Sequence, residues 1–305
     1  MQDVRVEGWP RFRTEEGRAR YLAAYDAALK AWPVPYREFD IETRLGPTHV
    51  VASGREDAPP LILLPSFAGT PSVWRANAEA LGRHFRVYAV DVIGQPGRSL
   101  ALRKLEGRRD YADWLTDVMD ALGVARASIV GCSFGGFLAL SQAALTPERV
   151  ERVALIGPAG CFKTLSWRLV LRMRTARWRR QLKGLIGLSS EPDPRTLHAR
   201  KAPLHPEDDA WRALMGVTMA ERAEVSITNA DVLGDAELRA IRAPTLLLIG
   251  EYETLYDPKA TLRLSKRLMP RLQGEIVKGA DHVAAMAQPE AVNARLLDFL
   301  QGAAC

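Results

Sequence analysis

The chain has 305 residues, of which 47% are hydrophobic and 26% are charged, and its formal net charge is +6. This is the composition of an ordinary globular protein that can bury a sizeable core, which argues against disorder. No run of about 18 apolar residues occurs, and no apolar leader segment follows Met1, so we expect a cytoplasmic protein without stable membrane insertion.

Cysteine usage and binding motifs exclude several further classes of site. Cys132, Cys161 and Cys305 are widely spaced and form no C-x-x-C pair, which argues against a disulfide framework or a zinc site. The sequence contains no G-x-x-x-x-G-K-[ST] or G-x-G-x-x-G loop and no H-E-x-x-H helix. We therefore expect neither a metal nor a cofactor. The positive charge is typical of a solvated basic face, and we expect no nucleic-acid partner.

The first predicted elements are one helix and two short strands. Thr14 is a candidate N-cap for a helix that carries acidic residues in its first turn and reaches Ala31. Residues 37–43 alternate between apolar and polar side chains, and residues 48–52 are rich in β-branched side chains. We expect these two strands to form an antiparallel edge of a sheet.

From Pro60 onwards the pattern is that of a parallel sheet. Residues 61–64 form a continuous apolar run, which is typical of a strand covered by helices on both faces. Further strands and helices then alternate in the order 87–90 (strand), 111–122 (helix), 128–131 (strand), 134–145 (helix) and 153–157 (strand). This order predicts a doubly wound α/β fold.

The alternation breaks between residues 161 and 231, where helical stretches occur without a convincing strand. It resumes with elements at residues 244–250 (strand), 259–269 (helix), 275–277 (strand) and 290–300 (helix). We interpret residues 161–231 as a helical cap inserted between two parts of one core, residues 1–160 and 232–305.

The predicted cap carries six arginines and no acidic residue between Lys163 and Lys183. One hypothesis is that this stretch attracts anionic substrates or an acidic membrane surface. We prefer the alternative that the arginines face water or pair elsewhere, while the apolar face covers the active site. Trp211, Met215 and Met219 recur at about helical spacing, which fits either a pocket wall or ordinary core.

A candidate nucleophile lies at the junction of a predicted strand and helix. Gly131, Ser133 and Gly135 form G-x-S-x-G, the spacing at which a serine is held on a sharp turn above the end of a strand. A serine hydroxyl is a weak nucleophile unless a base, usually a histidine held by a carboxylate, accepts its proton. Cys132 is adjacent, and we interpret it as a packed thiol.

Among the five histidines, only one stands where such a base is expected. His282 lies in a loop directly after a late strand and is the candidate base. His49 in an early edge strand and His84 near a helix end fit structural roles. His198 and His205 fall in the predicted cap, where both a pocket position and a solvated loop position stay open.

The order of serine, acid and histidine after successive strands resembles the alpha/beta-hydrolase superfamily. The resemblance extends from Tyr36 to the C-terminal part. Asp91-x-x-Gly94-x-x-Gly97-x-Ser99 is similar to a loop of that family, and residues 279–282 are similar to its histidine loop. The resemblance implies a mostly parallel twisted sheet with helices on both faces and a helical cap. More narrowly, residues 250–258 resemble the acid loop of bacterial carboxylesterase-type members.

Two carboxylates compete for the role of the acid. Glu253 follows the strand-ending Gly250 by three residues, which is where the superfamily commonly places its acid. Asp257 precedes Pro258, where a short carboxylate can cap the following helix. We prefer Glu253, which would orient the imidazole of His282 and stabilise its protonated form.

The resemblance also implies two main-chain amides that stabilise a developing oxyanion. These would be the N–H groups of Phe134, which follows the serine, and of Phe67, in the loop after the third strand. The sequence LPSFAG at residues 64–69 departs from the family, which usually has a His-Gly pair there. Pro65 has no N–H to donate, but it is not the residue that the role requires.

Together these residues predict a serine hydrolase that cleaves small to medium carboxylic esters through an acyl-enzyme, with Ser133, Glu253 and His282 as catalytic residues. The expected partner is a small-molecule ester, and the expected assembly is a monomer or homodimer. One alternative is that the same residues act on a lactone, a thioester or a carbon-carbon bond. Another is a small-molecule binder without turnover.

Overall fold

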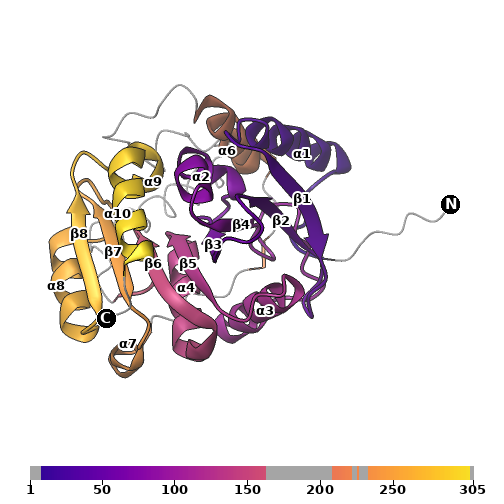
Figure 1. Ribbon diagram of the computed structural model, residues 1–305. Coiled ribbons are helices and arrows are strands. Elements are labelled where there is room, and N and C mark those ends of the chain that lie inside the picture. Colours follow the sequence, from indigo (N-terminus) through magenta and orange to yellow (C-terminus); the bar gives the residue numbers. More distant parts are fainter. Residues whose placement is uncertain (1–7, 163–207, 222–224, 227–232, 303–305) are drawn as a thin grey trace, which may run out of the picture.

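A computed structural model describes residues 8–162, 208–221, 225–226 and 233–302 (Figure 1). Its centre is an eight-stranded sheet with the strand order β1-β2-β4-β3-β5-β6-β7-β8. The strands are β1 (Tyr36–Ile41), β2 (Thr48–Ser53), β3 (Pro60–Leu64), β4 (Arg86–Val90), β5 (Ala127–Cys132), β6 (Val150–Ile156), β7 (Thr245–Gly250) and β8 (Leu272–Val277). The α/β fold class predicted from the sequence is confirmed.

The sheet combines an antiparallel edge with a parallel core. β1 pairs with β2 and β2 with β4 in antiparallel register, as the alternating patterns predicted. The remaining neighbours, from β4 through β3 to β8, are all parallel. Every residue of β5 and β7 is buried, because helices cover both faces of the sheet there. β6 and β8 each begin three residues before the predicted start.

Two apolar clusters, one on each face of the sheet, form the core. Successive residues of β3 alternate between them: Leu61 and Leu63 belong to one, and Ile62 and Leu64 to the other. The first cluster also includes residues of α1 (Glu15–Leu29), α2 (Arg75–Gly82), α9 (Ala284–Ala287) and α10 (Pro289–Gln301). The second includes residues of α3 (Arg108–Ala121), α4 (Phe134–Leu145), α7 (Asp235–Ala240) and α8 (Pro258–Leu268).

The remaining helices are short or belong to the segment between β6 and β7. They are the 3-10 turns η1 (Pro71–Trp74) and η2 (Pro147–Arg149), and α6 (Asp209–Glu221). α6 lies beside α1 (Figure 1), where Arg20 and Glu221 form an ion pair with an Nε–Oε1 distance of 2.7 Å. Most of residues 161–231 lies outside the described part, so the helical cap stays a prediction. No helix among the described residues is long and apolar enough to cross a bilayer.

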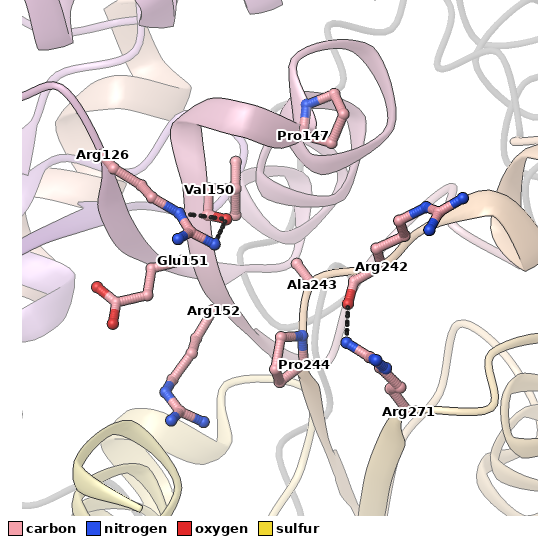
Figure 2. Close-up of a pocket in the computed structure, with 9 residues that line it drawn as sticks. All are labelled: Arg126, Pro147, Val150, Glu151, Arg152, Arg242, Ala243, Pro244 and Arg271. Carbon is pink, nitrogen blue, oxygen red and sulfur yellow. Dashed lines mark hydrogen bonds between the residues drawn. The ribbon is translucent and has the colours of Figure 1, made fainter. Parts of the chain in front are cut away.

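The amino ends of β5 to β8 meet at one edge of the sheet and enclose a hollow of about 240 Å³ (Figure 2). Arginine side chains there bind main-chain carbonyls. The guanidinium of Arg126 donates to the carbonyl oxygen of Val150, and that of Arg271 donates to the carbonyl oxygen of Arg242. The carboxyl ends of these strands, where Ser133 lies, form the opposite edge. Part of the positive charge of the chain is therefore gathered away from the predicted site.

The loop after β4 is organised by the buried carboxylate of Asp91. Its Oδ2 accepts hydrogen bonds from the hydroxyl of Tyr25 (3.0 Å) and the main-chain N–H of Arg98 (2.8 Å). A Cβ at Gly97 would lie 2.9 Å from the Asp91 carboxyl carbon, so the loop closes tightly around this group. Burial raises the pKa of Asp91 to about 6, although electrostatic interaction with His49 and Arg98 and the hydrogen bonds from Arg98 and Tyr25 oppose the rise.

Asp91→Asn is expected to change how stability depends on pH. The pKa of Asp91 is higher in the folded than in the unfolded chain, so its contribution to stability falls as the pH rises from about 4 to about 7. This difference between the folded and unfolded pKa values of Asp91 corresponds to a change of about 3 kcal/mol in the free energy of unfolding. Relative to wild type, the free energy of unfolding of Asp91→Asn should therefore increase by about this amount over that interval. Urea unfolding measures it, and a difference that does not vary with pH would contradict it.

Candidate active site

Ser133 lies at a strained turn between β5 and α4. Its φ of 52° and ψ of −111° are rarely adopted by a residue with a side chain, and its N–H is held by the carbonyl oxygen of Ile156 at 2.9 Å. Both flanking glycines are required by close backbone contacts. A Cβ at Gly131 would lie 2.2 Å from the carbonyl oxygen of Gly135, and a Cβ at Gly135 would lie 2.1 Å from that of Leu64.

The structure brings Ser133, His282 and Glu253 together from three loops at the carboxyl edge of the sheet. The Nε2 of His282 lies 2.8 Å from the Oγ of Ser133, and its Nδ1 lies 2.7 Å from the Oε2 of Glu253. A proton on Nδ1, donated to the carboxylate, leaves Nε2 free to accept the hydroxyl proton of Ser133. All three side chains are buried.

The carboxylate of Glu253 is held by the backbone of its own loop. Its Oε1 accepts hydrogen bonds from the N–H groups of Thr254 (2.7 Å) and Leu255 (2.8 Å), and its side chain has no exposed surface. These two bonds and the contact with His282 compensate the cost of burying a charge. The carboxylate is therefore fixed in place independently of any bound substrate.

Asp257, the competing acid, has a different partner. Its Oδ1 accepts a hydrogen bond of 2.8 Å from the N–H of Ala260 and caps α8, with Pro258 as the first residue of that helix. The capping role weighed from the sequence is therefore what the structure shows for Asp257. Glu253, not Asp257, contacts the imidazole of His282.

The other histidines and Cys132 lie outside this arrangement. His49 is buried in β2, where its Nδ1 lies 2.6 Å from a carboxylate oxygen of Asp40. His84 is exposed after α2. Burial, with the charge of Glu253 as a further cause, raises the pKa of Cys132 to about 12, so this residue stays a thiol at neutral pH, as expected of a packed cysteine. His198, His205 and the arginine-rich stretch lie outside the described residues.

Trp211, Met215 and Met219 lie on α6, and all three are partly buried. Trp211 packs against the core cluster that also contains residues of α1. This contact assigns Trp211 to core packing. For Met215 and Met219 both alternatives stay predictions.

The two residues expected to supply amide donors lie side by side. Phe134 is the first residue of α4, so its N–H has no acceptor within the helix. Phe67 is the second residue of a turn that is closed by a 2.8 Å hydrogen bond from Gly69 N–H to the carbonyl oxygen of Ser66. The two phenylalanine rings meet edge to face with their centroids 6.5 Å apart. Their assignment as oxyanion donors stays a prediction.

Gly157 is a residue of this site that the sequence analysis missed. It follows β6 with a φ of 52°, and a Cβ there would lie 2.7 Å from the carbonyl oxygen of His282 and 3.4 Å from its Nδ1. Glycine is therefore needed to let the histidine loop approach. A glycine directly after a buried strand was the available signal, but the partner is 125 positions away in the chain. Among the described residues, no group of three or more His, Cys, Asp or Glu residues is arranged to hold a metal ion.

Comparisons with known proteins show the family to which this chain belongs. A family model described as the alpha/beta hydrolase fold matches residues 59–289. Carboxylesterase YbfK of Bacillus subtilis (strain 168) is 35% identical over 296 residues, which cover 95% of this chain and 97% of the relative. An uncharacterized carboxylesterase, nap, of the same strain is 35% identical over 288 residues, covering 92% of each chain.

Solved structures show the same similarity. Carboxylesterase CesB (YbfK) from Bacillus subtilis has a TM-score of 0.78 at 34% identity, covering 95% of this chain and 100% of that one. Naproxen esterase (carboxylesterase NP) from Bacillus subtilis has a TM-score of 0.80 at 34% identity, and the match covers 94% of this chain and 99% of that one. The chain therefore belongs to the alpha/beta hydrolase family, in which it is similar to bacterial carboxylesterases.

Gly135→Ala is expected to disrupt the site. The added methyl group would overlap the carbonyl oxygen of Leu64, so α4 must shift away from β3. The melting temperature should therefore fall, and the hydrogen bond between Ser133 and His282 should be largely lost. Gly216→Ala in α6 is the matched control. Among the described residues, no atom outside the helix's own backbone lies within 4 Å of that added Cβ, so the control should be neutral or more stable by about 0.5–1 kcal/mol. Equal thermal unfolding of both variants would contradict the packing argument.

Proposed function

We propose that this protein is a serine carboxylesterase in which Ser133, His282 and Glu253 are the catalytic residues. The observation that carries the proposal is the continuous hydrogen-bonded chain from the Oγ of Ser133 through both imidazole nitrogens to a buried carboxylate. A serine held at a strained turn, with a base already within 2.8 Å, is arranged for nucleophilic attack.

In the proposed reaction, the Nε2 of His282 takes the hydroxyl proton while the Oγ of Ser133 attacks the ester carbonyl carbon. The N–H groups of Phe134 and Phe67 stabilise the resulting oxyanion. His282 then gives its proton to the departing alkoxide, which leaves an acyl-enzyme on Ser133. Water activated by the same imidazole releases the acid, and no cofactor takes part.

Glu253 has an electrostatic and an orienting part in this scheme. When His282 takes up the proton of Ser133, the imidazole becomes positively charged in a buried site. The carboxylate 2.7 Å away stabilises that charge and keeps the second ring proton on Nδ1. Because the loop N–H groups of Thr254 and Leu255 already hold the carboxylate, little rearrangement is needed during the reaction.

We further propose that the substrates are small-molecule esters with small to medium acyl and alcohol groups. Phe67 is 47% exposed although its ring packs against that of Phe134 beside the nucleophile, and this apolar surface suits an apolar substituent. Residues 161–231 are proposed to form the helical cap of the core, since they follow the carboxyl end of β6, at the edge where Ser133 lies. A cytoplasmic location and a monomeric or dimeric state are part of the same proposal; the two described cysteines, Cys132 and Cys161, are free.

A panel of p-nitrophenyl esters of increasing acyl length, run beside lactones and thioesters, tests the reaction class. We expect turnover of the short and medium esters, and a fluorophosphonate probe should label wild type but not Ser133→Ala. The variant should lose activity by a factor on the order of 10⁴ or more, since it lacks the hydroxyl that lies 2.8 Å from His282 Nε2. If wild type is not labelled, or if Ser133→Ala turns over esters like wild type, the proposal is wrong.

Glu253→Gln and Asp257→Asn separate the two acids. Glutamine keeps an acceptor for the N–H groups of Thr254 and Leu255 but removes the charge that stabilises protonated His282, so kcat should fall by a factor on the order of 10³. Asparagine caps helices about as well as aspartate, so Asp257→Asn should keep both stability and kcat. A larger loss of kcat in Asp257→Asn, at equal melting temperature, would reverse the assignment.

A further inference from the structure

The turn that follows β3 adopts a conformation that its sequence does not favour. Ala68, the third residue of the turn from Ser66 to Gly69, has a φ of 55°. Glycine or asparagine normally occupies such a position, because a Cβ crowds the backbone there. With alanine, rotation of the peptide between Phe67 and Ala68 to the common turn with negative φ is intrinsically preferred. Some other group must hold the observed form.

That group is the side chain of Gln95. Its Oε1 accepts a hydrogen bond of 3.1 Å from the main-chain N–H of Ala68, and Gln95 is only 1% exposed. The bond is made by the peptide whose rotation would change the turn. That rotation would therefore leave the buried Oε1 of Gln95 without the hydrogen bond from Ala68. It also occupies the N–H of Ala68, and the closing bond of the turn uses the N–H of Gly69. The N–H of Phe67 takes part in neither of these bonds.

Gln95 borders a buried network on its other side. Its amide group lies near the hydroxyl of Tyr111 and opposes the rise that burial causes in the pKa of that tyrosine, while its Nε2 has no hydrogen-bond partner among the described residues. The Tyr111 hydroxyl donates to the carbonyl oxygen of Ser226 at 3.2 Å, and the N–H of Ser226 donates to the carbonyl oxygen of Gly94 at 2.9 Å. Gly94, the residue before Gln95, is thus hydrogen-bonded to the segment that contains Ser226.

The same network reaches the other proposed oxyanion donor through aromatic contacts. The ring of Tyr111 meets that of Phe134 edge to face at 5.5 Å, and Phe134 meets Phe67 at 6.5 Å. Gln95 is therefore linked to the turn at residues 66–69 in two ways. One is its hydrogen bond with Ala68, and the other runs through the rings of Tyr111, Phe134 and Phe67. A change at Gln95 bears on where the Phe67 N–H points.

We propose that Gln95 is a positioning residue that holds the turn at residues 66–69 so that the N–H of Phe67 faces the oxyanion formed at Ser133. This inference rests on the proposed function. Gln95 touches neither the substrate nor the reacting atoms; it acts through Ala68. Its effect belongs to the transition state, because the carbonyl oxygen of a bound ester acquires its full negative charge only there.

Gln95→Met tests the role, because methionine has similar length but cannot accept the N–H of Ala68. We expect kcat on a p-nitrophenyl ester to fall roughly 10- to 100-fold, with KM changed less than about threefold, since misplacing one donor weakens charge stabilisation rather than substrate binding. The inhibition constant of a trifluoromethyl ketone, whose adduct carries an oxyanion, should rise in parallel. The corresponding methyl ketone should bind as it does to wild type.

Two further variants separate positioning from a loss of packing. Gln95→Glu keeps an acceptor for Ala68 and should recover most of the kcat that Gln95→Met loses. Gln142→Met is the matched control, because Gln142 is a buried glutamine of α4 whose side chain donates to Thr116 at 3.0 Å, away from Ser133. It should keep kcat within twofold. If Gln95→Met does not fold, Gln95→Asn, which shortens the side chain by one carbon, carries the same expectation.

The outcomes distinguish this inference from the proposed function. If wild type hydrolyses esters and Gln95→Met keeps its kcat within twofold, or loses activity through KM alone, the positioning role is overturned while the esterase assignment stands. Equal loss of affinity for the two ketones would also overturn it, since that marks a collapsed pocket. If wild type itself neither hydrolyses esters nor reacts with the fluorophosphonate, the proposed function fails first.

Discussion

The contact on which the site depends is the approach of α4 to the end of β3. Gly135 lies so close to Leu64 that a methyl group would overlap its carbonyl oxygen. Because the first turn of α4 touches the point where β3 ends, the amide after the nucleophile and the turn at residues 66–69 are neighbours. The strained backbone of Ser133 arises beside this contact, because β5 gives way to α4 within one residue.

The elements that the sequence predicted are those whose signal is local. Residues 61–64 are apolar without interruption, and helix α4 was predicted with the bounds that the structure shows. Ser133 was predicted from the G-x-S-x-G spacing, His282 from its loop after a late strand, and Glu253 from the position at which the resembling family places its acid. The structure brings these three side chains together. The short helices α7 and α9 were missed, because they have too few residues to show a period. Gly157 and Gln95 were missed because their partners are distant in the chain.

Two buried carboxylates show how differently the fold treats a charge. Both oxygens of Glu253 have partners: two loop N–H groups and the imidazole of His282. In Asp91 both hydrogen bonds go to Oδ2, and Oδ1 has no hydrogen-bond partner among the described residues. Burial accordingly raises the pKa of Asp91. The carboxylate of Glu253, which the proposed reaction needs, thus has more compensating partners than the carboxylate of Asp91 in the loop after β4.

The acid loop and the histidine loop are joined by main-chain bonds rather than by their functional side chains alone. The register of β7 and β8 pairs Gly250 with Val277, and beyond it the N–H of Tyr252 donates to the carbonyl oxygen of Ala280 at 2.9 Å. A Cβ at Gly250 would lie 2.1 Å from the carbonyl oxygen of Asp281, so the loops remain in contact as far as the histidine. The distance between Glu253 and His282 is therefore set by sheet register. Each residue that makes this link lies after residue 249, outside the segment that connects β6 to β7.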